Sequence, residues 1–175
     1  MFTIRQAQPS DEPKIAQLHA QSWRENYTQA LSAEFIEHQL FENRRQVWRE
    51  RFTKPALNQV VFVAEDSGNF CGFICLFGNN HSTHGTIIDN LHVANQAKGK
   101  GIGTQLIRVA AEWATKHYQA VGIYLEVLEC NPKAIGFYES LGAKNLGRKY
   151  WHTPCRNDVS EFMYGWSCPE QLTCL

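Results

Sequence analysis

The chain has 175 residues and a mass of 20.0 kDa, enough for one well-buried hydrophobic core and short for two full domains. Hydrophobic residues make up 43% and charged residues 19%, a composition too apolar for a disordered chain. Lysine plus arginine number 17, as do aspartate plus glutamate, so the chain lacks the basic excess typical of nucleic-acid-binding proteins.

The sequence shows no sign of export or of a membrane span. The first thirty residues hold no apolar run of the signal-peptide kind, and no apolar stretch approaches the roughly 20 residues that cross a bilayer. The six cysteines form no C-x-x-C pair, and His152 with Cys155 lacks a second pair at zinc-ligand spacing. We therefore expect a cytoplasmic protein with reduced thiols, no membrane partner and no metal.

The first half of the chain alternates between the two regular periodicities. Side chains that alternate in polarity, or β-branched and aromatic runs, predict strands, whereas apolar residues three and four apart predict helices. Expected in order are a strand at 2–6, a helix starting at Ser10 or Asp11, a helical stretch from about Ser32 to Trp48, a strand at 60–64, a returning strand at 70–77 and, after a polar loop at 79–85, a strand at 86–93.

The second half continues with a long helix, two further helix–strand alternations and a tail. We expect a helix from Ile102 to about Trp113, a strand at 122–127, a short helix through Tyr138 that Gly142 ends, and strands at 145–151 and 159–166. Residues 1–175 then form a single mixed α/β domain, with a strand–helix–strand unit at its centre. The residues from 168 onward carry Pro169 and are expected to form a loose tail.

A glycine-rich turn, Lys98-Gly99-Lys100-Gly101-Ile102-Gly103-Thr104, lies between a predicted strand and a predicted helix. Glycines there let the backbone adopt conformations that side chains forbid and let an anion approach the amides. The following helix directs its unpaired N–H groups and the positive end of its dipole at that anion. Two lysines add charge, so a pyrophosphate is the natural ligand, although a purely structural turn remains the alternative.

Spacing separates the families that use such a turn. No lysine followed by serine or threonine closes it, so the phosphate loop of nucleotide hydrolases is excluded. The dinucleotide pattern G-x-G-x-x-G also fails, because the third glycine position falls on Thr104 or Leu106. What remains is R/Q-x-x-G-x-G/A, with Lys98 in place of arginine or glutamine. About thirty residues later comes Asn131-x-x-Ala134-x-x-Phe137-Tyr138-x-x-x-Gly142-Ala143.

The two motifs together resemble those of the GNAT acetyltransferases, in the order in which that superfamily carries them. A departure is Ala143, where an aromatic residue is commoner. The segment Trp23-Arg24-x-x-Tyr27 resembles a subgroup with a W-R-x-x-Y first helix, so the resemblance covers nearly the whole chain. It implies a mixed sheet of about seven strands, splayed between the fourth and fifth and flanked by about four helices, with acyl-CoA in the gap.

The resemblance implies acetyl-CoA as cosubstrate and a primary amine of a small molecule or peptide as acceptor. The residues that would hold the cofactor come from three segments. They are the strand residues Leu91, His92 and Val93; the turn residues Lys98, Gly99, Lys100, Gly101, Ile102, Gly103 and Thr104; and Asn131, Ala134, Phe137 and Tyr138. The strand backbone would pair with the pantetheine amides, and the N–H of Val93 would polarise the thioester carbonyl.

Acyl transfer from a thioester to an amine also needs a general acid and a base. Tyr138 matches the family's general acid, which protonates the departing thiolate. Glu126, at the end of a strand beside the splay, is the first candidate for the base, followed by Asp89 and then His92. By period-two alternation Asp89 shares the face of Leu91 and Val93, so it must be paired or near the wet end of its strand. The competing interpretation of each candidate is a side chain, such as a carboxylate, that is only solvated or paired.

Trp23, Tyr27 and His152 are the candidates for the acceptor pocket, with core packing as the competing interpretation of the two aromatic residues. The alternative function is a non-catalytic acyl-CoA-binding sensor or interaction domain. Whether the protein is a monomer or a homodimer also stays open, because Phe162, Tyr164 and Trp166 suit an interface as well as a core.

Overall fold

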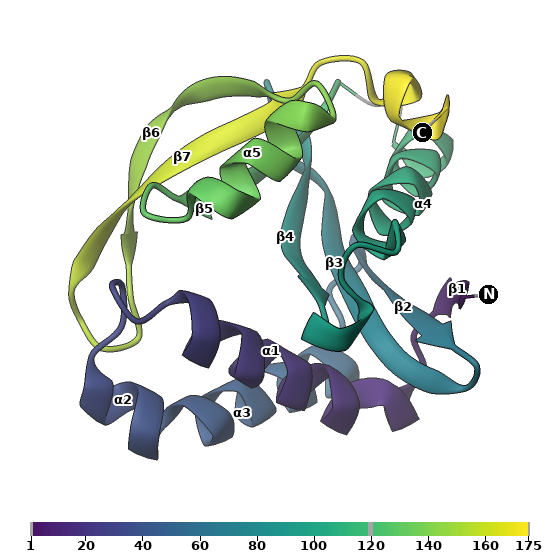
Figure 1. The fold of residues 1–175 in the computed structure, drawn as a ribbon. Coiled ribbons are helices and arrows are strands. Elements are labelled where there is room, and N and C mark those ends of the chain that lie inside the picture. Colours follow the sequence, from purple (N-terminus) through teal and green to yellow (C-terminus); the bar gives the residue numbers. More distant parts are fainter. Residues whose placement is uncertain (1, 119–120, 175) are drawn as a thin grey trace.

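In the computed structural model, which describes residues 2–118 and 121–174, the chain forms a seven-stranded mixed sheet with helices on both faces (Figure 1). The expected mixed α/β sheet of about seven strands is confirmed. The strands are β1 (Phe2–Gln6), β2 (Gln59–Asp66), β3 (Asn69–His81), β4 (Gly85–Val93), β5 (Ile123–Leu128), β6 (Lys144–His152) and β7 (Asp158–Trp166). The helices are α1 (Glu12–Asn26), α2 (Ala33–His38), α3 (Leu40–Thr53), α4 (Ile102–His117) and α5 (Pro132–Ser140), with short 3-10 turns at Pro9–Asp11, Asn95–Ala97 and Pro169–Cys174.

One expected helix is two. The stretch that begins after Ser32 breaks at Gln39, where the backbone leaves helical geometry, so the described residues contain five α-helices rather than about four. The hydroxyl of Ser32 caps α2 by accepting a hydrogen bond from the N–H of Phe35 at 3.2 Å. Phe35 and Leu40, on either side of the break, are both buried. The break lets both residues contribute to the same apolar cluster.

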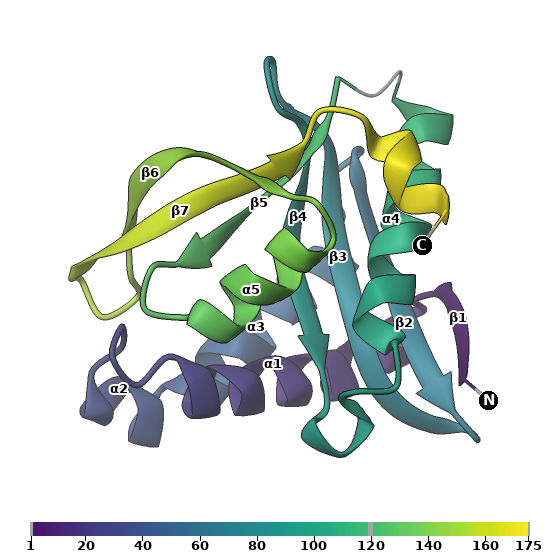
Figure 2. The ribbon, with the colours of Figure 1, turned by 45° about the horizontal axis from the view of Figure 1, so that its top comes forward.

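The order of the strands in the sheet is β1-β2-β3-β4-β5-β7-β6. All neighbours are antiparallel except β4 and β5, which pair in parallel over only three residues, Thr86–Ile88 against Ile123–Leu125. Beyond Ile88, β4 continues to Val93 beside β3, while β5 follows β7 as far as Leu128. The sheet therefore splays between its fourth and fifth strands, as Figure 2 shows.

Helices flank the splay on both faces of the sheet. α1 and α3 cover one face of β3 and β4, and α4 covers the other, while α5 packs on the β5–β7–β6 wing (Figures 1 and 2). The main core includes Ile15 of α1, Trp48 of α3, Phe73 of β3 and Leu106 of α4, all essentially inaccessible to solvent. A second cluster joins α1 and α2 to Leu128 at the end of β5. This cluster connects the first helices to the far side of the splay.

The segment after Trp166, for which the sequence predicts a loose tail, packs on the domain. Residues Pro169–Cys174 form a 3-10 helix beside α4. Pro169 and Leu172 are buried, and Leu172 belongs to the main core. The chain begins in the edge strand β1 and ends beside α4, and both lie on the right in Figure 1.

No helix among the described residues combines the length and the apolar character needed to cross a membrane. All six cysteines are free thiols, with Cys71 and Cys75 buried in β3.

The short β4–β5 pairing depends on two glycines, which yields a test of stability. Gly85 has a φ of 78°, and a Cβ there would lie 2.3 Å from the backbone oxygen of Gly122. We expect Gly85→Ala to lower the free energy of unfolding by about 2 kcal/mol or more, because a side chain meets both an unfavourable φ and a backbone atom. Chemical denaturation monitored by circular dichroism measures it.

Gly136 in α5 is the matched control, since a Cβ there meets nothing within 4 Å and its backbone is helical. Gly136→Ala is expected to leave stability unchanged or to raise it by about 0.5–1 kcal/mol. Equal stability of the two variants would contradict the role assigned to Gly85.

Candidate active site

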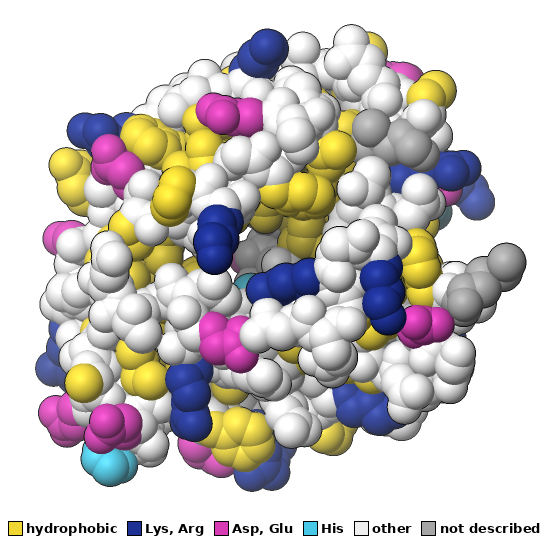
Figure 3. All heavy atoms as spheres, viewed as in Figure 1, with side chains coloured by type: hydrophobic (Ala, Val, Ile, Leu, Met, Phe, Trp, Pro, Cys, Tyr) yellow, Lys and Arg dark blue, Asp and Glu magenta, His cyan; other side chains and the backbone are white. Residues whose placement is uncertain are grey.

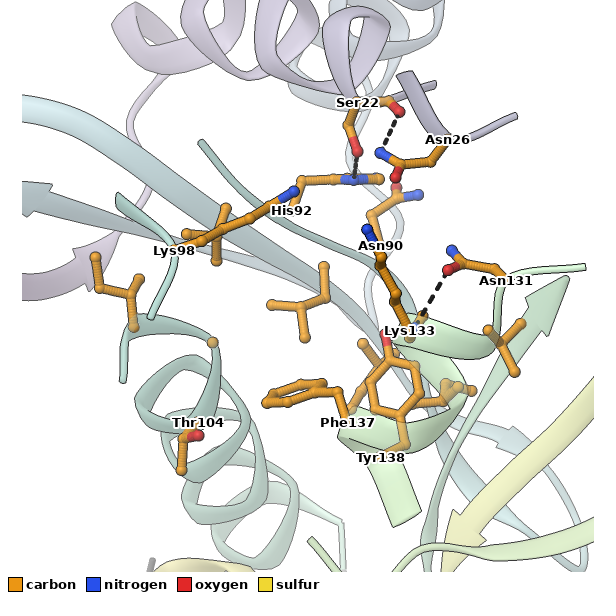
Figure 4. Close-up of a pocket in the computed structure, with 18 of the residues that line it drawn as sticks. Ser22, Asn26, Asn90, His92, Lys98, Thr104, Asn131, Lys133, Phe137 and Tyr138 are labelled. Carbon is orange, nitrogen blue, oxygen red and sulfur yellow. Dashed lines mark hydrogen bonds between the residues drawn. The ribbon is translucent and has the colours of Figure 1, made fainter. Parts of the chain in front are cut away.

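A cavity of about 520 Å³ occupies the splay between β4 and β5. Its walls are the C-terminal end of α1, the second halves of β4 and β5, the glycine turn with the start of α4, and the face of α5 that carries Phe137 and Tyr138. Figure 3 shows the hollow from outside, with hydrophobic side chains within it and Lys or Arg side chains at its rim. Figure 4 shows polar groups reaching into it from both sides.

The glycine turn has the backbone conformation that its sequence predicts. Gly99 and Gly101 have φ values of 78° and 79°, in the left-handed region that other residues rarely adopt. Gly101 immediately precedes α4, whose first N–H groups face the cavity together with the turn. A Cβ on Gly103 would lie 3.3 Å from the ring of Phe137, so the start of α4 approaches α5 closely. These features make a cradle for an anion at a helix N-terminus.

The lysines near the turn divide into two groups. Lys98 and Lys133, which lies at the start of α5, both line the cavity, and Figure 4 shows both side chains directed into it. The Nζ of Lys100 instead lies 3.5 Å from the carboxylate of Asp66, and Lys100 is not among the cavity-lining residues. The sequence predicts that Lys98 and Lys100 both help to bind the anion, whereas the lysines that line the cavity in the structure are Lys98 and Lys133.

The position of Asp89 corrects an expectation from strand alternation. β4 pairs Asn90 with Cys75 but Ile88 with Leu76, so a β-bulge at Asp89 interrupts the alternation. Arg51 of α3 contacts both Asp89 and Asn90. Its Nη1 lies 2.7 Å from Asp89 Oδ2 and 2.9 Å from Asn90 Oδ1.

The prediction that Asp89 shares the face of Leu91 and Val93 is therefore wrong. Val93 faces α4, because a Cβ at its strand partner Gly72 would contact both Val93 and Leu106. Asp89 faces α3 on the other side of the sheet. The bulge accounts for the difference, and the expectation that this carboxylate must be paired agrees with its contact to Arg51.

His92 lies on the α1 side of β4. Its Nδ1 is 2.8 Å from the hydroxyl of Ser22, and both residues line the cavity (Figure 4). Burial, followed by the charges of Arg44 and Lys98, lowers the pKa of His92 to about 3. The imidazole is therefore neutral at pH 7 and is a weak base.

The start of α5 is organised by Asn131. Its Oδ1 accepts a hydrogen bond from the N–H of Ala134 at 3.2 Å, which caps the helix and leaves the amide NH2 for a ligand. One turn later Phe137 and Tyr138 both line the cavity. All four α5 residues named by the motif, Asn131, Ala134, Phe137 and Tyr138, thus border the same space.

The hydroxyl of Tyr138 is available to a ligand. Its ring points into the cavity (Figure 4), and within residues 2–118 and 121–174 the hydroxyl has no hydrogen-bond partner. Burial raises the pKa of Tyr138 to about 12, so it stays protonated throughout the physiological range. The side chain can donate a hydrogen bond to an atom that becomes negative.

Glu126 lines the cavity from β5 and is ion-paired. Its Oε1 accepts a hydrogen bond from Lys149 Nζ at 2.7 Å. Glu126 and Asp89 therefore border the cavity from its two walls, each beside its own cation. The two highest-ranked candidates for the base thus line the same cavity, and each carboxylate forms an ion pair.

The three acceptor-pocket candidates have different positions. Tyr27 lines the cavity and stacks on Trp23, with ring centroids 5.0 Å apart. Trp23 is buried behind it and belongs to the core, the interpretation that competed with a binding role. His152 is exposed at the end of β6, pairs with Asp158 at 2.9 Å and does not line the cavity. The structure thus separates His152 from the other two.

Several lining residues are missing from the sequence-based set. Ser22 and Asn26 contribute polar groups from α1, Asn90 from the bulge and Lys133 from α5. Helical spacing offered a signal for the first two, because positions 22 and 26 continue the side of α1 that carries His19 and Trp23. Lys133 lies inside the second motif itself. Asn90 was also within reach of the sequence, because period-two alternation places it on the face of His92, and β4 pairs with β3 without interruption between these two residues.

The residues present fit an acyl-CoA. An anion cradle and two lysines suit its phosphates, and the edge of β4 beyond Ile88, which β5 leaves unpaired, offers backbone groups to its amides. Metal chemistry has no comparable support, since the described part of the chain contains no group of three His, Cys, Asp or Glu side chains placed to hold an ion.

Comparison with known proteins assigns the family. Residues 13–143, well over half of the chain, match the model of the acetyltransferase (GNAT) family. The chain belongs to the GNAT family. This GNAT chain is 32% identical over 147 residues to an uncharacterized N-acetyltransferase of Bacillus subtilis, covering 81% of this chain and 89% of the relative.

Two further comparisons agree with this assignment. A probable N-acetyltransferase of Mycobacterium tuberculosis is 29% identical over 155 residues, covering 86% of this GNAT chain and 84% of the relative. A GCN5-related N-acetyltransferase from Rhodopseudomonas palustris has a similar fold, with a TM-score of 0.74, 20% identity and coverage of 93% of each chain. The GNAT family uses acetyl-CoA.

The division among the lysines gives a prediction for binding. Lys98→Ala and Lys133→Ala are each expected to weaken CoA binding about tenfold at low salt, equivalent to about 1.4 kcal/mol, because each removes a cation that lines the cavity. The salt dependence of the dissociation constant is expected to become shallower in both variants. Isothermal titration calorimetry at two ionic strengths measures both effects.

Lys100→Ala is the matched control, because it removes the same charge from a residue that contacts Asp66 and not the cavity. Its affinity for CoA is expected to stay within about twofold of wild type, as for an exposed charge. A larger loss in Lys100→Ala than in the other two variants would overturn the division.

Proposed function

We propose that the protein transfers an acetyl group from acetyl-CoA to a primary amine of a small molecule or peptide, by direct attack of the amine on the thioester. The observation that carries the proposal is that one cavity holds both an anion cradle at the start of α4 and, on α5, the hydroxyl of Tyr138, which has no hydrogen-bond partner among the described residues. A cradle alone would suit many phosphate ligands. The hydroxyl adds a group suited to a departing thiolate.

The turn amides from Gly99 to Thr104, with Lys98 and Lys133, are proposed to hold the phosphates. The backbone of Leu91–Val93 lies on the stretch of β4 that β5 leaves unpaired, and it is proposed to bind the pantetheine amides as an added strand would. A backbone N–H at Val93 would polarise the thioester carbonyl, and the free amide group of Asn131 would reach the same arm.

Tyr138 is proposed as the general acid. A thiol has an ordinary pKa of about 8.5, so complete proton transfer from a tyrosine whose pKa is about 12 is unfavourable by roughly 5 kcal/mol. The Tyr138 hydroxyl is proposed to act in the transition state, because charge then develops on the sulfur and strengthens the hydrogen bond from the hydroxyl. Proton transfer can then be completed together with loss of the proton from the attacking amine.

The base remains a choice between Glu126, Asp89 and water that they orient. Both carboxylates border the cavity, and each has a cationic nitrogen 2.7 Å away, Arg51 for Asp89 and Lys149 for Glu126. His92, the third candidate, is disfavoured because burial makes it a weak base. The acceptor is proposed to enter past Ser22, Asn26 and Tyr27, where α1 borders the cavity.

The general-acid role predicts a split between turnover and binding. Tyr138→Phe is expected to lower kcat by about tenfold to a hundredfold, because the hydrogen bond to the developing thiolate is lost. The dissociation constant for acetyl-CoA is expected to change less than about twofold, since the ring remains. Thiol release measured with a disulfide reagent gives kcat, and calorimetry gives the affinity.

Tyr150→Phe serves as the control, because Tyr150 is exposed on β6 and away from the cavity. It is expected to leave both quantities unchanged. Unchanged kcat in Tyr138→Phe would refute the general-acid role.

A screen separates the enzyme from a non-catalytic acyl-CoA-binding domain. The wild-type protein with acetyl-CoA is expected to release CoA in the presence of at least one primary amine among alkylamines, polyamines, amino acids, aminoglycosides and peptides with free N-termini. The product mass is expected to exceed the amine by one acetyl group. Tight acetyl-CoA binding without amine-dependent release across the panel would favour the sensor or interaction domain.

A further inference from the structure

The wing formed by β5, β7 and β6 carries a carboxylate that the proposed reaction does not use. Glu161 of β7 lies opposite Leu128 of β5 on one side and opposite Lys149 of β6 on the other. Side chains directly opposite one another share a face of the sheet, and Glu126 shares the face of Leu128 two residues away. Because Leu128 packs with Trp23, this face is the one turned towards α1.

Glu161 is a buried carboxylate. It is 8% exposed, and its Oε2 has no hydrogen-bond partner among the described residues. Lys149 gives its hydrogen bond to Glu126 instead, at 2.7 Å. Burial, followed by the charge of Glu126, raises the pKa of Glu161 to about 7, against the opposing charge of Lys149. One lysine thus faces two carboxylates, and near neutral pH a proton on Glu161 balances the group.

Two neighbours connect this group to the cavity. Glu126 lines the cavity directly, and so does Tyr27 at the end of α1. Burial raises the pKa of Tyr27 well above its usual range, so this hydroxyl is neutral and adds no charge to the group. The charged groups beside Glu161 on this face are Glu126 of β5 and Lys149 of β6, and the neutral Tyr27, which follows α1, lines the cavity next to Glu126.

We propose that Glu161 makes this wall of the cavity a site for an alkylammonium ion, whose arrival displaces the proton of Glu161 into solvent. The incoming cation supplies the positive charge that the cluster lacks, so two carboxylates then face two ammonium groups. No bond of the ligand is made or broken, and one proton leaves for each cation bound. Glu161 acts through Glu126 and Lys149, and is a positioning residue in this sense.

The inference deepens the proposed function by naming the acceptor class. The acceptor binds as an aliphatic amine that is charged at neutral pH, with a pKa near 10 as in lysine. An uncharged molecule of the same shape gains nothing from the carboxylates. An acceptor with an anionic group beside its amine is disfavoured, because that group would meet Glu126 in the cavity wall, with Glu161 behind it.

Calorimetry with benzylamine tests the proposal without any turnover. Benzylammonium is titrated into the protein saturated with CoA, in two buffers of different ionisation enthalpy, so that released protons are counted. Wild type is expected to release close to one proton per ligand at pH 6 and almost none at pH 8, because Glu161 is mostly ionised at pH 8 while the ligand is still protonated. Its affinity for benzylammonium is expected to rise about tenfold between pH 6 and pH 8.

Glu161→Gln is expected to abolish the proton release and to flatten this pH dependence. Glu129→Gln is the matched control, because Glu129 is exposed, pairs with Arg148 and does not line the cavity. It is expected to behave as wild type. Benzyl alcohol, which has the same shape without the charge, is expected to release no proton from any variant.

A stability measurement checks the state of Glu161 independently. Its pKa is higher in the folded protein than the 4.5 of an ordinary glutamate, so ionisation disfavours the fold. Relative to Glu161→Gln, wild type is expected to lose thermal stability as the pH rises from about 4.5 to about 7, with a constant difference above that range. A melting-temperature difference that does not change with pH would contradict a raised pKa.

The proposal is overturned if wild type binds no benzylammonium, binds it without releasing a proton, or if Glu161→Gln still releases one. These results are separable from failure of the proposed reaction. Proton-coupled binding of benzylammonium without acetyl transfer to any amine would sink the reaction and leave the cation site. Acetyl transfer without proton-coupled binding would sink only the cation site.

Discussion

Three residue pairs between β4 and β5 determine where this protein can hold a ligand. Thr86–Ile88 pair with Ile123–Leu125, and beyond them each strand stays with its other neighbour, β4 with β3 and β5 with β7. Both strands therefore present inner edges that need hydrogen-bond partners. The glycine turn follows directly from one of these strands and α5 from the other, so the anion cradle and Tyr138 face one another across the gap. The cavity exists because the pairing between the two central strands, β4 and β5, ends after three residues.

Much of this architecture could be predicted, because the local periodicities agree with the fold. Every predicted strand exists, since alternation and β-branched runs suit a sheet whose faces helices cover. Three features were beyond reach. The helix break at Gln39, the extension of β3 to His81 through a polar segment and the bulge at Asp89 each depend on tertiary contacts. The early end of the β4–β5 pairing came only from resemblance to the family.

The candidate site was predictable where backbone conformation decides it and unpredictable where side-chain direction does. Gly99 and Gly101 adopt the left-handed conformation that only glycine adopts readily, so the glycines in the sequence predict it. The sequence does not predict the ion-pair partners of Asp89, Lys100 and Glu126, because each contacts a residue distant in the chain. Glu161 was visible as one acid between Val159 and Met163 on the same strand face, but its lack of a partner emerges only from the register of three strands.

Hydrogen–deuterium exchange with and without acetyl-CoA tests the central claim, that the splay between β4 and β5 is the cofactor site. Binding is expected to protect the amides of residues 89–93 and 98–104, which border the splay, and to leave those of β1 and β2 unchanged. Protection of these two segments, together with any protection of α5, which also lines the cavity, would support the account. Acetyl-CoA that binds without protecting either segment, or that protects a different surface, would contradict it.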